Sequence, residues 1–431
     1  MSTERIVVIG GGAGGLELVV RLARKLRRSR STEVVLVDKS PTHIWKPLLH
    51  EVATGSMNSY HDEVSYRMLG RKHGFGFALG RVVDIDLAAR RIALAAITDD
   101  TGNEMLPARS LEYSEVVICV GSQCNDFGIE GVERFSKQLD SREQAEELHR
   151  LFTAQLYRVN SSDSPQTSLS LAIVGGGATG VELAADMHNV VERLRDYGFD
   201  HFSQGRLSVT VIEAAPRLLP QLPERIGASV AHELGQIGVT VRTGTRVARV
   251  ERNGVVTSED EIIPADISVW AAGVKAPDWL AKAGFPCDRL GRIEVESDLS
   301  VRGMTGVYAI GDCCRCRMDD GTEVPPRAQA AHQMATVAAR NLLASRRNRR
   351  ARAFVYHDFG SLVSLSRFST IGNLMGNLMH GSVFVEGWLA RMAYLSLYRM
   401  HQRAVFGVFS TLLIMLGDRI YKATRAEIKL H

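Results

Sequence analysis

The strongest constraint on the fold of this chain is a glycine-rich turn of spacing G-x-G-x-x-G that occurs twice. The first copy follows the apolar run IVVI, the second follows LAIV, and a helical pattern begins within each copy. In this context the turn places the pyrophosphate of a dinucleotide at a helix N-terminus, where free N–H groups face the anion. One dinucleotide needs one turn, so we expect two ligands. The glycines are Gly10, Gly12 and Gly15 in the first turn and Gly175, Gly177 and Gly180 in the second.

An acidic residue ends the next strand after each turn. Asp38 closes EVVLVD, and Glu213 closes LSVTVIE at a longer spacing because of a polar stretch at 193–206. Such a carboxylate accepts hydrogen bonds from ribose hydroxyls. Ala214 and Ala215 follow Glu213, where an arginine could have accepted a 2′-phosphate, so the second turn is predicted to prefer NADH over NADPH. FAD and NADH, one tightly bound and one exchangeable, are the obvious pair of ligands.

Length and composition fit an α/β protein of several domains. A chain of 431 residues, 45% of them hydrophobic, can form two or three cores of ordinary size. The two strand–turn–helix units predict two Rossmann-like dinucleotide-binding domains. The opening RIVVIGGG is typical of a buried strand and not of a signal peptide, so we expect the protein to stay in the cytosol. The spacing of the six cysteines does not suggest a set of disulfide bonds, and we expect free thiols in a reducing compartment.

Basic residues are concentrated in the C-terminal part of the chain. Residues 340–431 contain 14 lysines and arginines against 4 aspartates and glutamates, whereas the whole chain has a net charge of only +4. A basic tail on an acidic body suggests an anionic partner, either a membrane surface or nucleic acid. The run SRRNRRAR at 345–352 has no nucleic-acid recognition motif beside it, so we expect no nucleic-acid partner.

The C-terminal segment 381–431 has the composition of a membrane-associating helical segment. Its longest uncharged stretch, 404–417, has 14 residues, fewer than the ~20 that a spanning helix needs. Aromatic residues mixed with arginines precede this stretch, and lysines and arginines follow it, which fits helices that lie at the headgroup level. The alternative is that part of 387–403 forms a dimer interface or core.

Beyond the two turns, the sequence resembles the bacterial type II NADH dehydrogenases, single-subunit NADH:quinone reductases that do not pump protons. These are flavoprotein pyridine-nucleotide oxidoreductases with two dinucleotide-binding domains. The resemblance covers essentially the whole chain. Its specific marks are VDKSPTHIWKPLLHEVATGS at 37–56, VGS at 120–122, VWAAGVKAPD at 269–278, YAIGDC at 308–313 and PPRAQAAHQMA at 325–335.

The resemblance implies an FAD domain that is split around an inserted NADH domain. In YAIGDC it implies that Asp312 bonds the ribityl chain of FAD, and Lys46 is expected to border the flavin. The implied ranges are 1–125 for the first part of the FAD domain, 126–290 for the NADH domain, 291–380 for the second part of the FAD domain with the quinone-site helix, and 381–431 for the membrane-association segment.

The resemblance also assigns residues to the reaction. Gln329 and Gln333 form the A-Q-x-A-x-Q motif associated with quinone, whose two carbonyl oxygens can accept from uncharged amide N–H groups. His332 within the motif is left without a role. Glu182, directly after the second turn, would position NADH or tune hydride transfer, and a helix-terminal acid without catalytic function is the alternative. The prolines at 325–326 are expected to open the glutamine-bearing helix, with its N-terminus toward the flavin.

The function that the resemblance implies is NADH:quinone oxidoreduction without a metal, by hydride transfer to FAD and two-electron reduction of a membrane quinone. It also implies a homodimer on the cytoplasmic face of the bacterial inner membrane, peripheral to the bilayer. Two rivals stay open. Cys313 and Cys316 form C-x-x-C directly after Asp312, and a sulfide:quinone oxidoreductase needs a cysteine pair, although such enzymes do not use NADH. The other rival is a membrane redox sensor that binds both cofactors without rapid turnover.

Overall fold

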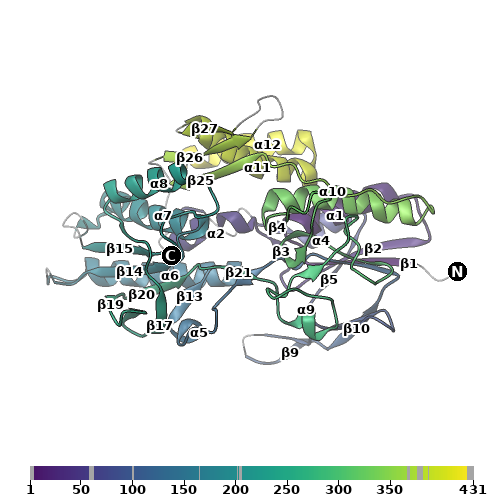
Figure 1. Cartoon of the computed structure of the whole chain (residues 1–431), viewed down its shortest axis with the longest axis horizontal. Helices are drawn as coiled ribbons and strands as arrows, with labels where there is room; N and C mark the ends of the chain where they lie inside the picture. The colour runs from purple at the N-terminus through teal and green to yellow at the C-terminus, as the bar shows by residue number, and fades with distance from the viewer. Residues whose placement is uncertain are drawn as a thin grey trace.

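The computed structural model describes residues 4–57, 63–99, 101–164, 166–200, 202, 206–365, 369–375, 382–386 and 388–424. Two parallel sheets stand next to one another, and a further layer of strands and helices lies along one side of both (Figure 1).

The first sheet has the strand order β23-β11-β1-β2-β5, and its strands are all parallel. The central strand β1 is buried over residues 6–9, as expected for a strand that is covered on both faces. Helix α1 follows β1 directly and packs against α10 (Figure 1). The bounds are β1 Glu4–Ile9, α1 Ala13–Leu26, β2 Thr32–Asp38, β5 Gly76–Leu79, β11 Glu115–Ile118, β23 Val307–Ala309 and α10 Ala328–Ser345.

The second sheet repeats this architecture with the order β13-β20-β14-β15-β16, again all parallel. Helix α6 begins with a capping box in which Ser141 and Gln144 satisfy each other's backbone N–H groups. The bounds are β13 Ser136–Gln138, α6 Arg142–Asn160, β14 Leu169–Val174, α7 Ala178–Leu194, β15 Leu207–Ile212, α8 Glu224–Gln236, β16 Thr240–Arg242 and β20 Ile267–Trp270.

Shorter elements complete the two domains. In the first part of the chain these are β3 Thr42–His43, η1 Lys46–Leu48, α2 Leu49–Thr54, β4 Val64–Ser65, α4 Tyr66–His73, β6 Val82–Asp86, β7 Arg91–Leu94, β8 Ile97–Thr98, β9 Glu104–Leu106, β10 Arg109–Glu112 and β12 Gln123–Cys124. In the later part they are α5 Val132–Phe135, η2 Arg195–Tyr197, β17 Val247–Glu251, β18 Gly254–Thr257, β19 Ile262–Pro264, β21 Val274–Lys275, α9 Trp279–Lys282, β22 Ile293–Glu294, η4 Gly311–Cys313 and β24 Cys314–Arg315.

The chain leaves the first sheet, builds the second, and returns. Strand β23 adds to the edge of the first sheet beside β11, although all the strands of the second sheet come before it in the sequence. At the crossover, β12 pairs antiparallel with β21, and Ala276, Leu280 and Phe285 already belong to the first core. The predicted α/β fold, with one domain split around another, is therefore confirmed. The exact domain boundaries stay predictions.

A C-terminal layer packs on both domains. It consists of an antiparallel sheet of order β25-β26-β27 and two helices. Val363 and Leu365 of β25 are buried in the core of the second domain, and Val405 of α11 is buried in the core of the first. This layer therefore bridges the two domains (Figure 1). The bounds are β25 Gly360–Leu365, β26 Ser369–Met375, β27 Ser382–Glu386, α11 Trp388–Phe406 and α12 Val408–Thr424.

The uncharged stretch 404–417 is divided between two helices, because Gly407 adopts φ +88° and separates α11 from α12. One expectation for the helices needs correction. Helix α10 begins at Ala328 and not at the prolines 325–326, because Arg327 has extended backbone at φ −142° and ψ 150° and serves as the N-cap. None of the described helices is both long enough and apolar enough to cross a bilayer.

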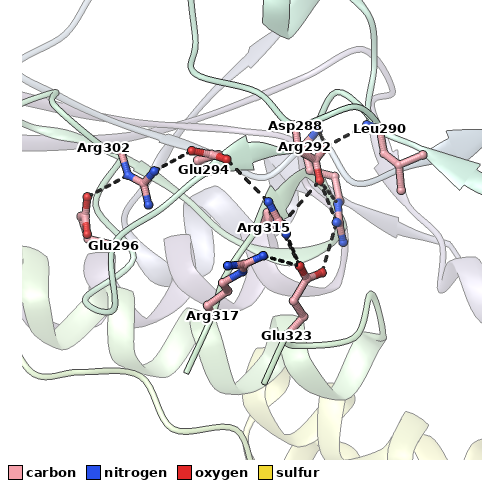
Figure 2. A network of polar contacts seen from close by, with 9 residues as sticks. All are labelled: Asp288, Leu290, Arg292, Glu294, Glu296, Arg302, Arg315, Arg317 and Glu323. Carbon is pink, nitrogen blue, oxygen red and sulfur yellow. Dashed lines mark hydrogen bonds and ion pairs between the residues drawn. The ribbon is translucent and has the colours of Figure 1, made fainter. Parts of the chain in front are cut away.

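A network of arginines and carboxylates stabilises residues 288–323, the segment around β23 in which the chain returns to the first sheet. Arg315 lies between Glu294, at 3.6 Å, and Glu323, while Arg302 contacts Glu294 at 2.8 Å. Figure 2 shows these contacts around the parallel pair β22–β24. Each surface pair contributes only about 0–1 kcal/mol, but the network joins strands on both sides of η4. The full set is Asp288, Leu290, Arg292, Glu294, Glu296, Arg302, Arg315, Arg317 and Glu323.

Candidate active site

The first glycine turn has the geometry of a dinucleotide cradle. Gly10 has φ +99°, and a Cβ on Gly15 would lie 1.9 Å from the Gly10 carbonyl oxygen, so neither position accepts a side chain. At Gly12, by contrast, a Cβ would meet no described atom within 4 Å, which is the open space that a pyrophosphate requires. Asp38 accepts hydrogen bonds from the backbone N–H of Gly11 at 2.5 Å and of Ser40 at 2.8 Å.

The second turn repeats this geometry. A Cβ on Gly180 would lie 2.0 Å from the Gly175 carbonyl oxygen, and one on Gly177 would meet nothing described within 4 Å. Glu213 accepts from the backbone N–H of Gly176 at 2.7 Å. Both cradles therefore combine a helix N-terminus, open space at the central glycine and a carboxylate at the end of the next strand. These features fit one dinucleotide each.

Lys46 and Asp312 are brought together through one serine. The Lys46 ammonium donates to the Ser122 carbonyl oxygen at 2.8 Å, and the Ser122 hydroxyl donates to Asp312 Oδ2 at 3.0 Å. Lys46 also pairs with Asp140 at 3.1 Å. Burial raises the pKa of Asp312, against the lowering effects of Ser122 and Lys46. Residues from three of the sequence marks, VDKSPTHIWKPLLHEVATGS, VGS and YAIGDC, thus meet beside the first sheet. Their role at a flavin stays a prediction.

A cavity of about 1330 Å³ connects the second cradle with the glutamine-bearing helix. Gly175, Gly177 and Glu213 line one part of it, and Gln329 and residues of the C-terminal layer line another. The glycines of the first cradle, with Asp38 and Asp312, are not among the lining residues. The structure therefore joins the second cradle directly to the predicted quinone helix, while the first cradle lies outside this cavity.

Glu182 is buried and is not among the residues that line the cavity. Its Oε1 accepts from the backbone N–H of Ser364 in β25 at 3.0 Å, and its Oε2 lies 3.7 Å from His50 Nδ1. His50 Nε2 in turn is 3.5 Å from Asp186. Burial raises the pKa of Glu182 well above its usual value, and burial lowers the pKa of His50. Glu182 therefore links the second cradle's helix to the C-terminal layer.

The two motif glutamines hold the backbone that leads into β25. The Gln329 amide donates to Asp358 Oδ1 and to the Gly360 carbonyl oxygen, both at 3.1 Å. The Gln333 amide donates to the His357 carbonyl oxygen at 2.8 Å and accepts from the His357 N–H at 3.0 Å. Gln329 lines the cavity and Gln333 does not. Sequence reasoning alone did not indicate these backbone partners.

Sequence reasoning also missed a buried group of one glutamate and three histidines, which we call the imidazole cluster. It comprises Glu17, His43, His332 and His401, of which Glu17, His43 and His401 are buried. Trp45 stacks beside it, with its ring 4.5 Å from that of His401. The available signal was a glutamate inside the apolar helix start LELVV, where an unpaired charge would be costly.

The cysteines of the C-x-x-C stretch are buried thiols. Cys313 donates to the carbonyl oxygens of Ile118 at 3.5 Å and Ile310 at 3.4 Å. Burial raises the pKa of Cys313 to about 12 and that of Cys316 to about 11. Because a thiolate is the reactive form of cysteine, this environment favours a structural role.

Two dinucleotide cradles on separate parallel sheets, with one domain split around the other, define a pyridine-nucleotide oxidoreductase architecture. The chain matches the family described as pyridine nucleotide-disulphide oxidoreductase over residues 4–335. A type II NADH:quinone oxidoreductase of Haemophilus influenzae is 39% identical, over 99% of this chain and 100% of that protein. The chain belongs to the pyridine nucleotide-disulphide oxidoreductase family, and within it to the type II NADH:quinone oxidoreductases.

Solved structures share the fold. NDH2 of Plasmodium falciparum, solved in complex with NADH, has a TM-score of 0.80 at 18% identity and covers 99% of this chain and 100% of its own. The sulfide:quinone oxidoreductase of Aquifex aeolicus has a TM-score of 0.70 at 17% identity, with 94% of this chain and 92% of its own covered. At these identities the likeness concerns the fold alone.

Gly180→Ala is expected to abolish tight NADH binding while FAD content stays unchanged. The new Cβ would overlap the Gly175 carbonyl oxygen, so the cradle must shift, and a loss of about 1.4 kcal/mol already weakens binding tenfold. Isothermal titration with NADH measures the effect. Gly235→Ala, on α8 with nothing within 4 Å, is the matched control. Equal NADH affinity of the two variants would contradict the cradle assignment.

The wild-type chain is expected to show a higher kcat/KM for NADH than for NADPH, and Glu213→Gln to reduce this preference by about tenfold. The carboxylate accepts from uncharged ribose and repels a 2′-phosphate, and one charge-assisted hydrogen bond contributes about 1.5–3 kcal/mol. Steady-state kinetics with both nucleotides measure the ratio. Glu224→Gln, exposed at the start of α8, serves as the control. Equal kcat/KM for both nucleotides in the wild type would refute the assignment.

Proposed function

We propose that this chain oxidises NADH and reduces a membrane quinone, with FAD as the resident cofactor. The observation that carries the proposal is the cavity, because it joins the second dinucleotide cradle to the helix with the A-Q-x-A-x-Q motif. The Haemophilus influenzae relative at 39% identity is a type II NADH:quinone oxidoreductase. The residues of the first cradle fit FAD, and those of the second fit NADH.

When bound, FAD supplies the redox chemistry by accepting a hydride from NADH and passing two electrons to the quinone. The chain supplies binding and orientation. Asp38 and Glu213 would bind the two adenosine riboses, and the N-termini of α1 and α7 would hold the two pyrophosphates. The Lys46–Ser122–Asp312 chain of hydrogen bonds holds the flavin side of the first domain.

The motif glutamines and Glu182 are assigned to the quinone and nicotinamide side. Gln329 is on the cavity wall, and it can offer an amide N–H to a quinone oxygen by giving up its bond to Asp358 or Gly360. Gln333 supports the same wall through His357. Glu182 positions the cradle helix against β25. All three are expected to alter turnover more than folding.

The two rival functions are not favoured. A sulfide:quinone oxidoreductase needs accessible, reactive cysteines, whereas Cys313 and Cys316 are buried with raised pKa values. A sensor without turnover would not need a cavity that joins the nucleotide cradle to the glutamine motif.

Helix α12 provides the surface for a lipid bilayer. Its exposed apolar side chains recur along one face, and Phe409 is 76% exposed. A contiguous apolar face of this kind marks an interaction site. The preceding helix α11 is anchored differently, since Val405 and His401 are buried against the first domain. The exposed residues are Val408, Phe409, Leu412, Leu413, Met415, Leu416 and Ile420.

We infer a peripheral position on the cytoplasmic face of the bacterial inner membrane, with the polar body in the cytosol. Two basic residues, Arg425 and Lys429, follow α12 in the sequence and lie outside the described residues; positive charge at this point of the chain would attract anionic lipid. Arg346, in the basic run at 345–352, pairs with Glu115 at 3.0 Å and with Glu4, so it is not available to nucleic acid. A homodimer stays a prediction, and sedimentation velocity tests it.

The test of the function is steady-state NADH oxidation by the FAD-loaded protein with and without a short-chain quinone. Turnover that depends on quinone is expected. If NADH bleaches the flavin and quinone does not restore its absorbance, the quinone assignment fails and another acceptor must be sought.

Phe409→Glu with Leu413→Glu is expected to weaken binding to anionic vesicles by at least tenfold. Each large apolar side chain contributes about 1.5–3 kcal/mol on leaving water, and charge on this face prevents insertion. Vesicle co-sedimentation measures binding, and turnover with a water-soluble quinone should stay unchanged. Met105→Glu with Ile262→Glu, at exposed positions of β9 and β19, makes the same chemical change elsewhere. Equal membrane binding of both double variants would contradict the α12 assignment.

A further inference from the structure

A buried glutamate joins three helices at the wall of the cavity. Glu17, on α1, is only 1% exposed. Its Oε2 lies 2.6 Å from His332 Nδ1 on α10, and its Oε1 lies 2.9 Å from His401 Nδ1 on α11. Arg21, on α1, lies 3.6 Å from Oε2. Glu17, His332 and His401 all line the cavity that also contains Gln329.

The directions of the hydrogen bonds assign the protons of His401. The Gly11 carbonyl oxygen can only accept, so His43 Nδ1, 2.9 Å away, donates to it. Burial is the largest of the effects that lower the pKa of His43 to about 3, so this ring is neutral and its Nε2 accepts. His401 Nε2, 3.0 Å from that atom, must donate. On the other side of the ring, His401 Nδ1 donates to Glu17 Oε1 at 2.9 Å.

The second carboxylate oxygen of Glu17, Oε2, contacts the imidazole of His332. Burial would raise the pKa of Glu17, but hydrogen bonds with His332 and His401 outweigh it and the pKa is lowered. The carboxylate is therefore ionised, and its Oε2 contacts His332 Nδ1 as an ion pair at 2.6 Å. The other ring nitrogen, Nε2, has no hydrogen-bond partner among the described residues. The His332 side chain is 27% exposed, and it lies three residues after Gln329, on the same side of α10.

Quinone reduction requires a proton that NADH does not supply. The balanced reaction is NADH + H⁺ + quinone → NAD⁺ + quinol. The quinone gains two electrons and two protons, whereas the hydride brings two electrons and one proton. The other proton must come from a protein group or water at the quinone site.

We propose that His332 donates this proton to a quinone oxygen and that Glu17 is the positioning residue that orients it. The O–H bond forms as the Nε2–H bond of a doubly protonated His332 breaks, and the neutral ring regains a proton from water in the cavity. The carboxylate stabilises the positive ring and keeps Nδ1 turned away from the quinone, as a carboxylate does for other catalytic histidines. His401 and His43 hold Glu17 in place from the C-terminal layer and the first cradle. The inference rests on the proposed function, because it needs a quinone in the cavity.

The experiment separates proton delivery from electron transfer. The full-length FAD-loaded chain is reduced with NADH in a stopped-flow instrument and then mixed with a short-chain ubiquinone or with ferricyanide, which takes electrons without protons. For His332→Gln, recovery with quinone should slow on the order of 100-fold, the range for loss of a general acid. Recovery with ferricyanide and the initial bleaching by NADH should stay within about twofold of the wild type. His232→Gln, at an exposed position of α8, is the control.

Further readouts identify the role of Glu17. Glu17→Gln should make the quinone rate decline at a lower pH than in the wild type, because the positive ring loses its carboxylate. The Kd for quinone, measured by quenching of tryptophan fluorescence, should stay unchanged in both variants. A wild-type quinone rate in His332→Gln, or an equal loss with ferricyanide, would overturn the proposal. If the flavin absorbance of the wild-type protein recovers with ferricyanide but not with quinone, the proposed function itself fails.

Discussion

The close approach of backbone to backbone at the two glycine turns is the constraint on which this structure depends. At each turn a Cβ on the third glycine would lie about 2 Å from the carbonyl oxygen of the first, so only glycine lets the helix start so near the strand. This approach directs the N-terminus of α1 or α7 into open space at the central glycine. It also brings Asp38 or Glu213 onto the turn's own backbone N–H. Two anion sites of the same design follow from it.

The C-terminal layer packs on both domains and connects the parts of the site that each domain contributes. Strand β25 packs into the second domain through Val363 and Leu365, and its backbone binds Glu182. Helix α11 packs into the first domain through Val405 and bonds Glu17 through His401. The same layer presents the exposed face of α12. The proposed membrane contact and the geometry of the cavity would therefore depend on the same segment.

Local features of the site could be predicted from the sequence, and contacts between distant segments could not. The glycines and the acids Asp38 and Glu213 form short motifs whose geometry is set within one strand–turn–helix unit, so their arrangement follows from spacing. The imidazole cluster depends on His43 and His401, which are 358 positions apart, and no local pattern shows that their rings meet. The family resemblance gave Gln329 and Gln333 a role, but their bonds to residues 357–360 appear only in the fold.

Helix ends could not be predicted for a related reason. Hydrophobicity alone does not indicate the break at Gly407, where a positive φ separates α11 from α12. The preference of proline for the first helical position misplaced the start of α10, because Arg327 takes the N-cap position instead.

Each chain is expected to hold one FAD and one exchangeable nicotinamide dinucleotide in different cradles. An anaerobic titration of the purified, FAD-saturated chain with NADH tests this directly, with the FAD content determined on the same sample. We expect one FAD per chain and complete bleaching by one equivalent of NADH. Two FAD per chain, or NADH binding without bleaching, would contradict it.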